Sequence, residues 1–149
     1  MVKLNFPEGK FKIYKSPDGV FIFDLVRKKQ ILLTPEEWVR QHLINYLNVE
    51  KNYPLSLMKL EMQLNINNLK RRPDLVVYSK QGNPIFIGEC KAPNIGISQD
   101  VFEQIAQYNI ALKVPYLLVT NGMNHYQCKV DHQSNKITFL QEIPSYDEL

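Results

Sequence analysis

Two short apolar runs, at residues 75–78 and 85–87, constrain the fold of this chain more than any other feature. Both are rich in β-branched and aromatic residues, which is the composition of strands that are covered on both faces. The segment between them, 79–84, reads Ser-Lys-Gln-Gly-Asn-Pro and consists largely of turn formers. The pattern therefore predicts a β-hairpin whose two strands are packed against other elements on either side.

Three charged residues stand at one end of this predicted hairpin. Glu89 and Lys91 are two positions apart on the second strand, so their side chains share one face. If Tyr78 lies opposite Ile85, the same register continues to the far end of the hairpin. Asp74 then lies opposite Glu89, and the Cβ atoms of directly opposed residues are about 4.5–5.5 Å apart. A register slip of one residue would separate the two carboxylates, so the site depends on this pairing.

The chemistry of these residues predicts a metal site. Two carboxylates this close repel each other unless a cation lies between them. Mg²⁺ is held by one or two carboxylates plus waters and phosphate oxygens, so Asp74 and Glu89 are predicted metal ligands, with Mn²⁺ as a substitute ion. A bound metal activates water and polarises a phosphate, and Lys91 can stabilise the charge that develops. The alternative is a hairpin with an ordinary Glu-Lys pair on its exposed face.

Basic residues cluster at 27–29 and again at Lys70, Arg71 and Arg72. The second cluster directly precedes Asp74, so its side chains are candidates for gripping the phosphates of a nucleic acid. A solvated loop between two strands explains the same cluster equally well. The net charge of +3 is mild, and it permits contact with a polyanion without arguing for one.

The chain has 149 residues, which is the size of one domain. We expect an N-terminal β-hairpin extension at residues 1–33 and a core at residues 34–143. The two cysteines, Cys90 and Cys128, lack metal-binding spacing and are interpreted as reduced thiols of a cytoplasmic protein. No signal peptide or transmembrane stretch is visible, so no membrane association is expected.

Hydrophobic patterns predict further strands at residues 11–14, 20–23, 57–66, 115–120, 126–130 and 136–140. Residues 57–66 alternate between apolar and polar side chains, as in a strand with one buried face. Glu61 lies on the polar face of that strand, where it is either a solvent-facing residue or a weaker candidate metal ligand. The acidic tail from residue 145 onward is expected to be frayed.

Two helices complete the pattern. Thr34 and Pro35 begin the first, which ends near residue 49, and Glu37 completes a capping box. Ser98 caps the second, which extends to about residue 112. One mixed sheet with a helix on each face accommodates this order, which is an α/β fold.

The charged motif resembles that of the PD-(D/E)xK nuclease superfamily, with Pro-Asp at 73–74 and Glu-Cys-Lys at 89–91. The segment 34–126 also resembles the amino-terminal nuclease domain of type I restriction enzyme R subunits. The similarity includes the opening helix at 35–41 and the sequence Val-Thr-Asn-Gly at 119–122. It implies a restriction-endonuclease-like fold and a metal-dependent deoxyribonuclease.

The resemblance implies roles for other residues. Gln104 and Tyr108 resemble the Gln-x-x-x-Tyr motif of this family and of RecB-like nucleases. They are four residues apart on one helix face and could hold a DNA phosphate or orient Lys91. Without the resemblance, the better interpretation is that they form the polar edge of the helix, with Tyr108 half-buried. Glu37 resembles a helix glutamate that some members add to the metal site, although capping explains it fully.

Type I R subunits are large and carry helicase domains, whereas this sequence has no Walker-type Gly-rich loop. We therefore expect a stand-alone nuclease acting on DNA. Cutting both strands of a duplex would favour a homodimer, and proteins of a restriction-modification or defence system are further expected partners. The alternative is a non-catalytic module that retains the nuclease fold and binds nucleic acid or another protein.

Overall fold

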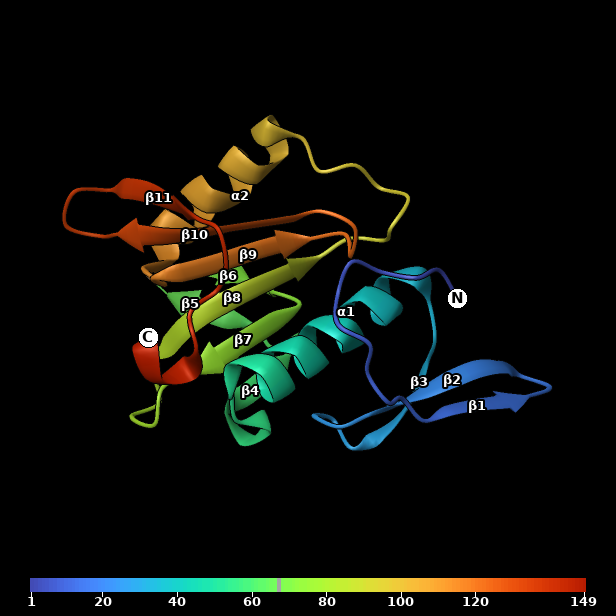
Figure 1. The fold of residues 1–149 in the computed structure, drawn as a ribbon. Coiled ribbons are helices and arrows are strands. Elements are labelled where there is room, and N and C mark those ends of the chain that lie inside the picture. Colours follow the sequence, from blue (N-terminus) through green and yellow to red (C-terminus); the bar gives the residue numbers. More distant parts are fainter. Residues whose placement is uncertain (67) are drawn as a thin grey trace.

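The computed structural model describes residues 1–66 and 68–149, except for the side chains of Ile66, Leu69, Tyr108 and Ala111. Its body is a six-stranded mixed sheet in the order β11-β10-β9-β8-β7-β4 (Figure 1). Strands β8 and β9 run parallel, and the other neighbouring strands are antiparallel. The strands of this sheet are β4 (Met58–Leu60), β7 (Leu75–Tyr78), β8 (Pro84–Cys90), β9 (Tyr116–Thr120), β10 (His125–Asp131) and β11 (Lys136–Leu140).

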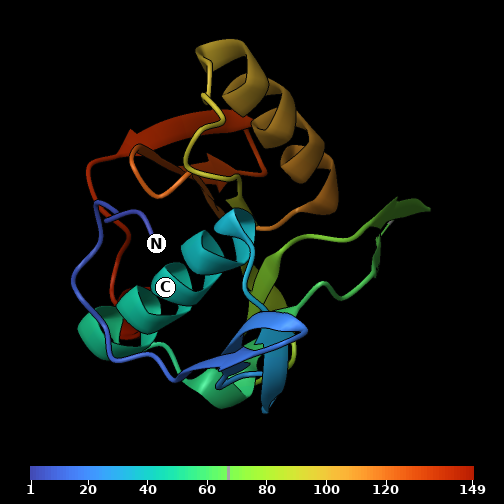
Figure 2. The same cartoon turned by 90° about the vertical axis from the view of Figure 1, so that its right-hand side faces the viewer.

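One helix covers each face of the sheet. Helix α1 (Pro35–Asn45), continued by a π-helical turn (Tyr46–Glu50), shares a buried cluster with Leu75 and Val77 of β7. Helix α2 (Gln99–Leu112) shares a second cluster with Val76, which points to the opposite face (Figure 2). The predicted hairpin with covered strands and the mixed α/β sheet are therefore confirmed.

Both helices begin where the sequence predicts. The Thr34 hydroxyl accepts a hydrogen bond from the backbone N–H of Glu37 at 3.0 Å, and the Ser98 hydroxyl accepts one from Val101 at 3.2 Å. These bonds satisfy N–H groups that have no partner inside the helix. The second half of the capping box is wrong, because the Glu37 carboxylate pairs with Arg27 and Arg40 instead.

The single strand predicted at residues 57–66 is wrong. Strand β4 ends at Leu60, and Glu61 has a φ of 52°, in the left-handed region that interrupts a strand. Strand β5 (Leu64–Ile66) then pairs with β6 (Leu69–Arg71) in a separate two-stranded sheet, which projects from the body in Figure 2. The alternation misleads because Met58 and Leu64 are buried in two different clusters.

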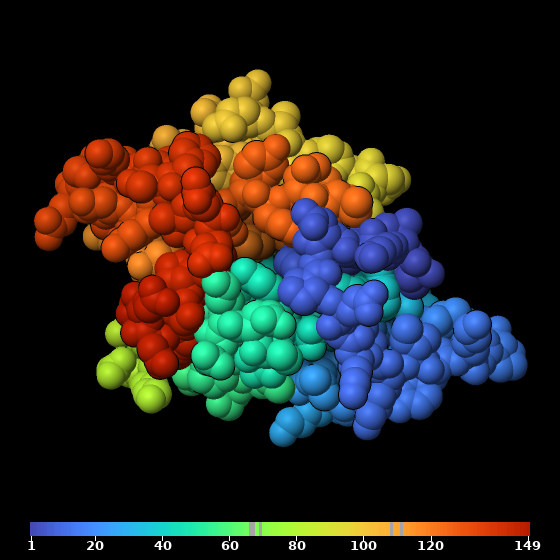
Figure 3. Space-filling model, in the orientation of Figure 1, coloured from blue at the N-terminus to red at the C-terminus, as the bar shows by residue number. Residues whose placement is uncertain are grey.

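The N-terminal hairpin is present and is extended to three antiparallel strands. These are β1 (Ile13–Ser16), β2 (Gly19–Asp24) and β3 (Lys29–Leu32). Gly19 follows the tight turn between β1 and β2 with a φ of 135°, a conformation that only glycine adopts without strain. In the space-filling view this sheet protrudes from the body at the opposite end from the β10–β11 hairpin (Figure 3).

The C-terminal tail is ordered, so the expectation that it frays is wrong. Ile143 is fully buried, and the Tyr53 hydroxyl donates a hydrogen bond to the Pro144 carbonyl at 2.9 Å. The Tyr146 hydroxyl donates to the carbonyl of Tyr78 at 3.1 Å. These apolar and aromatic contacts outweigh the acidic composition on which the expectation rested. Within the described chain, no helix is long and apolar enough to cross a membrane.

Candidate active site

The register of the central hairpin brings the two carboxylates together. Strands β7 and β8 pair Leu75 with Gly88, and the same register extends by one step to place Asp74 opposite Glu89. The supposed starting pair is wrong, because an irregularity after Val77 places Tyr78 opposite Pro84. This irregularity lies at the turn end of the hairpin, so it does not alter the register at the acidic end.

Asp74 is held by its side chain and by its backbone. The Asp74 carboxylate accepts a hydrogen bond from the backbone N–H of Cys90 at 2.7 Å, which ties this side chain to the end of β8. Its carbonyl accepts from the N–H of Glu61 at 3.3 Å and from the guanidinium of Arg40 at 3.5 Å. These contacts fix one carboxylate of the pair at the end of β7.

Glu89 lies beside Asp74 in a largely buried position. Burial raises the pKa of Glu89, and the neighbouring Asp74 carboxyl raises it further, while Arg71 opposes the shift. Arg71, at the end of β6, forms an ion pair with the Glu89 carboxylate. The acidic pair therefore requires positive charge, and a guanidinium from the β5–β6 hairpin supplies it.

Lys91 follows β8 and is exposed. Its backbone N–H donates a hydrogen bond to the carbonyl of Thr120 at the end of β9, at 2.8 Å. The side chain of Glu36 also belongs to this region. Burial raises the pKa of Glu36 and Asp74 raises it further, whereas Arg40 and Lys91 lower it. The pKa of Glu36, in the first turn of α1, is therefore influenced by both Asp74 and Lys91.

Glu36 therefore interacts electrostatically with Asp74 and Lys91, whereas Glu37, which the resemblance indicated, has other partners. Glu37 is buried, and its carboxylate accepts hydrogen bonds from Arg27 at 2.8 Å and Gln41 at 3.0 Å. The family resemblance indicated Glu37, whereas the phase of the helix points to the neighbouring residue, Glu36. Glu36 is three residues before Val39, which packs on the sheet, so the two share a helix face.

The Glu61 carboxylate, like that of Glu37, is bound by arginine side chains. Its side chain is 43% exposed and forms ion pairs with Arg40 at 3.4 Å and with Arg27 at 3.6 Å. Two guanidinium groups therefore neutralise this carboxylate. Its backbone contributes to the site by donating to the Asp74 carbonyl. The structure thus gives Glu61 a supporting position instead of the metal-facing one that the sequence allowed.

The basic cluster lies beside the acidic pair. Arg71 is bound to Glu89, and the Arg72 side chain donates a hydrogen bond to the carbonyl of Glu61 at 2.7 Å. Lys70 is exposed on β6. The interpretation as a plain solvated loop is wrong for this cluster, because Lys70 and Arg71 belong to a strand.

Gln104 and Tyr108 lie on α2. Gln104 is exposed and lines a groove together with Ile137 and Phe139 of β11. Strands β9 and β10 separate β11 from β8, so the structure does not bring Gln104 to the acidic pair. The side chain of Tyr108 lies outside the described residues.

Residues 119–122 support the segment that follows Lys91. The Asn121 side-chain amide donates to the Ile95 carbonyl at 2.8 Å, and its oxygen accepts from the backbone of Asn124 at 2.8 Å. Gly122 has a φ of 86°, and an added Cβ there would lie 2.8 Å from Leu4. This turn therefore holds the loop after β8 in place, which is a structural role.

The donor set fits a hard divalent ion. Among the described residues, no group of three or more His, Cys, Asp or Glu side chains is arranged to hold a metal alone. Mg²⁺ does not require such a group, since it keeps several waters and often takes one or two carboxylates. Asp74 and Glu89 provide these. Burial is the main cause of the raised pKa of Glu89 and the Asp74 carboxyl adds to it, and a bound dication would favour the ionised form of both groups.

The mixed sheet, the helix on each face and the acidic pair at the end of the central hairpin define a restriction-endonuclease-like α/β domain. Residues 35–144 match the family described as Type I restriction enzyme R protein N terminus, and the chain belongs to this family.

A solved structure is similar in fold. It is described as a fragment of an HsdR subunit of a type I restriction enzyme from Vibrio vulnificus YJ016, with a TM-score of 0.55 and 19% sequence identity. The similarity covers 78% of this chain and 24% of that one, so this chain spans about a quarter of the solved fragment. No curated protein sequence matches the chain.

Proposed function

We propose that this domain is a Mg²⁺-dependent deoxyribonuclease that hydrolyses phosphodiester bonds. The observation that carries the proposal is the β7–β8 register, which opposes Asp74 and Glu89 with Lys91 two residues further on. Membership of the type I restriction R-subunit family supports DNA as the substrate class and proteins of a restriction-modification system as partners.

Each residue has a distinct task in this proposal. Asp74 and Glu89 hold the divalent ion, which when bound polarises the phosphate and activates a water molecule. Lys91 is an exposed point charge that stabilises negative charge on the phosphate undergoing attack. Glu36 approaches from α1, where its carboxyl can accept a hydrogen bond from the attacking water.

A non-catalytic nucleic-acid-binding module is the second candidate, and the Arg71–Glu89 ion pair is the observation that favours it. A guanidinium that remains on Glu89 takes up one of the two carboxylates that the metal requires. In the nuclease proposal, Arg71 leaves Glu89 and binds a substrate phosphate when the metal is present. The nuclease and the binding module therefore differ in whether the Glu89 carboxylate is released from Arg71 to bind the metal.

Plasmid cleavage tests the proposal. Purified protein is incubated with supercoiled and linear plasmid in Mg²⁺ or Mn²⁺, beside Asp74→Ala and Lys91→Ala. Lys80→Ala is the matched control, since this exposed lysine lies in the turn at the far end of the same hairpin. We expect the wild type and Lys80→Ala to cut, and the other two variants to lose activity.

Equal cleavage by all variants, or none by the wild type, would overturn the nuclease assignment. A gel shift on the same samples then separates the binding module, which retains DNA binding, from an interaction protein, which does not.

A further inference from the structure

The positive charge of this chain is concentrated in its first 33 residues. This segment contains seven Lys and Arg residues against three Asp and Glu, a net charge of +4, whereas residues 34–149 contain eleven against twelve, a net charge of −1. The three-stranded sheet β1–β3 lies in this segment and precedes the region matched by the family, which starts at residue 35. An N-terminal segment with this charge is complementary to a polyanion.

One face of the sheet carries apolar and aromatic side chains that remain partly uncovered. The register places Tyr14 of β1, Phe21 of β2 and Leu32 of β3 in one row. Tyr14 is 41% exposed and Leu32 is 51% exposed. The alternate residues Ile22 and Asp24 are fully buried, so they mark the opposite face as the one that packs inward.

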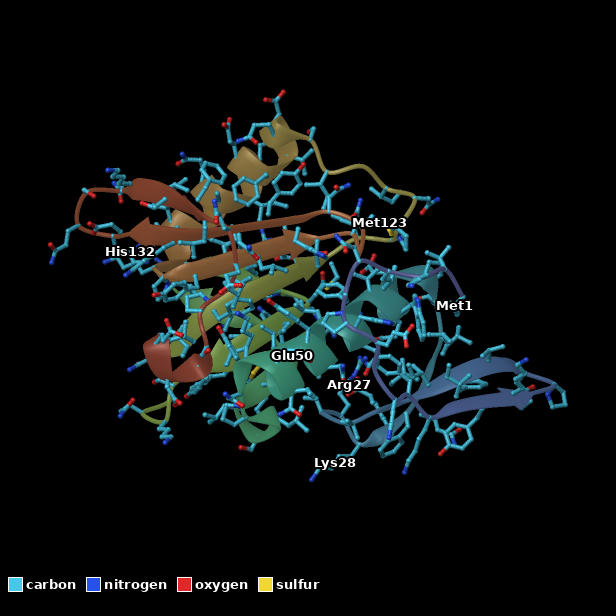
Figure 4. All side chains as sticks on the ribbon, viewed as in Figure 1. Met1, Arg27, Lys28, Glu50, Met123 and His132 are labelled. Carbon is cyan, nitrogen blue, oxygen red and sulfur yellow. The ribbon has the colours of Figure 1, made fainter. Side chains whose placement is uncertain are left out.

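One lysine shares this outer face. Lys12 is two residues before Tyr14, and its ammonium lies 5.9 Å from the centre of the Phe23 ring. Lys15 and Lys29 are exposed on the two edge strands, but their register partners Val20 and Asp24 place them on the opposite face. Every described ion pair of this segment is made by Arg27, which is directed toward α1 in Figure 4, while Lys28 points away from the body.

We propose that the outer face of β1–β3 binds a single strand of nucleic acid. Aromatic rings on a sheet offer stacking surfaces for unpaired bases, and a lysine beside them neutralises a phosphate. Tyr14 and Phe21 stack on bases, and Lys12 contacts the backbone. A duplex keeps its bases stacked inside, so it cannot use the aromatic row.

The sheet is connected to the proposed nuclease site. Arg27, in the turn between β2 and β3, forms an ion pair with Glu61 at 3.6 Å, and the backbone of Glu61 bonds to Asp74. In the proposal, a strand bound at the acidic pair continues onto the sheet. Single-stranded DNA is then the substrate class of the proposed nuclease. Only this connection between the sheet and the acidic pair rests on the proposed function, whereas binding by the sheet does not.

Fluorescence anisotropy with a labelled oligo(dT) and a matched duplex tests the proposal. All proteins carry Asp74→Ala, so that binding is measured without cleavage. Tyr14→Ala should weaken oligo(dT) binding by at least about fivefold, since one lost stacking contact is worth about 1–3 kcal/mol. Tyr14→Phe keeps the ring and should bind within about twofold of the parent.

Lys12 is tested by salt dependence. The variant Lys12→Ala should reduce the slope of log K against log salt by about 0.7, which is the value for one phosphate contact. Matched controls lie on the β10–β11 hairpin at the other end of the molecule (Figure 1). They are Phe139→Ala, where Phe139 is 54% exposed, and Lys136→Ala.

The outcomes are distinguishable. Loss confined to the variants of the N-terminal sheet, with oligo(dT) preferred over duplex, establishes the site even if plasmid cleavage fails. Unchanged binding by the Tyr14→Ala and Lys12→Ala variants overturns the proposal even if plasmid cleavage succeeds. Equal losses in the β10–β11 controls, or a preference for duplex, also overturn it, because general charge or duplex contacts would then explain the binding. Circular dichroism of each variant confirms folding.

Discussion

Replacing Arg40 with methionine should destabilise the protein strongly. Arg40 is buried, and its guanidinium lies 3.2 Å from the Glu37 carboxylate and 3.4 Å from that of Glu61. Removing one partner of a buried ion pair costs about 3–5 kcal/mol, because the other charge remains away from water. Arg27 still pairs with Glu37 in the variant, so we expect the lower end of this range, about 3 kcal/mol.

Urea and thermal unfolding followed by circular dichroism measure this cost. For a chain of this size, about 3 kcal/mol corresponds to a fall in Tm of about 6–12 °C. The double variant Arg40→Met, Glu37→Met should recover part of the loss, because it removes the uncompensated carboxylate as well. The recovery is the signature of a buried pair.

Lys51→Met provides the control. Lys51 also forms an ion pair, at 3.5 Å from Glu142, but Glu142 is mostly exposed. An exposed pair is worth about 0–1 kcal/mol, so this variant should change the free energy of unfolding by less than Arg40→Met does. A loss for Arg40→Met below about 1 kcal/mol, or equal losses for the two variants, would refute the assignment of a buried network.

Three further predictions concern other parts of the molecule. Burial lowers the pKa of His42 below its ordinary value of 6.5. As the pH falls through 6.5, His42 becomes protonated in the unfolded state while it stays neutral in the folded state. The free energy of unfolding should therefore decrease as the pH falls, and His42→Phe should flatten the pH dependence of the urea midpoint. Gly122→Ala should cost about 1–3 kcal/mol more than Gly82→Ala, because both residues have positive φ but only Gly122 lacks space for a Cβ. Glu36→Gln should lower plasmid cleavage at least about tenfold and leave the Tm unchanged. Glu37→Gln weakens buried ion pairs, so it should lower the Tm by several degrees, at about 2–4 °C per kcal/mol of lost stability.

The acidic end of the hairpin was predictable because local rules determine it. Period-two alternation and the position of the turn set the register, and an irregularity beside Tyr78 left that register intact at Asp74. The break at Glu61 was not predictable, since the apolar alternation continues across it and two separate clusters bury its two halves. The Arg71–Glu89 pair depends on how a separate hairpin docks, which no local pattern encodes.

The N-terminal sheet also contributes to the electrostatics of the family-matched region. Within residues 35–144, Arg40 pairs with the carboxylates of both Glu37 and Glu61. Arg27 adds a second guanidinium from outside that region, at 2.8 Å from Glu37, and Asp24 adds a third carboxylate, at 2.7 Å from Arg27.

Arg40 in turn donates to the carbonyl of Asp74, so the network that begins at the sheet ends at the backbone of a proposed metal ligand. The position of Asp74 therefore depends on residues that precede the family-matched region. Arg27→Met should weaken Mn²⁺ binding, measured by titration calorimetry, without removing a ligand, whereas Lys28→Met, in the same turn, should not. Equal Mn²⁺ affinity in the two variants would show that the sheet and the acidic pair are energetically independent.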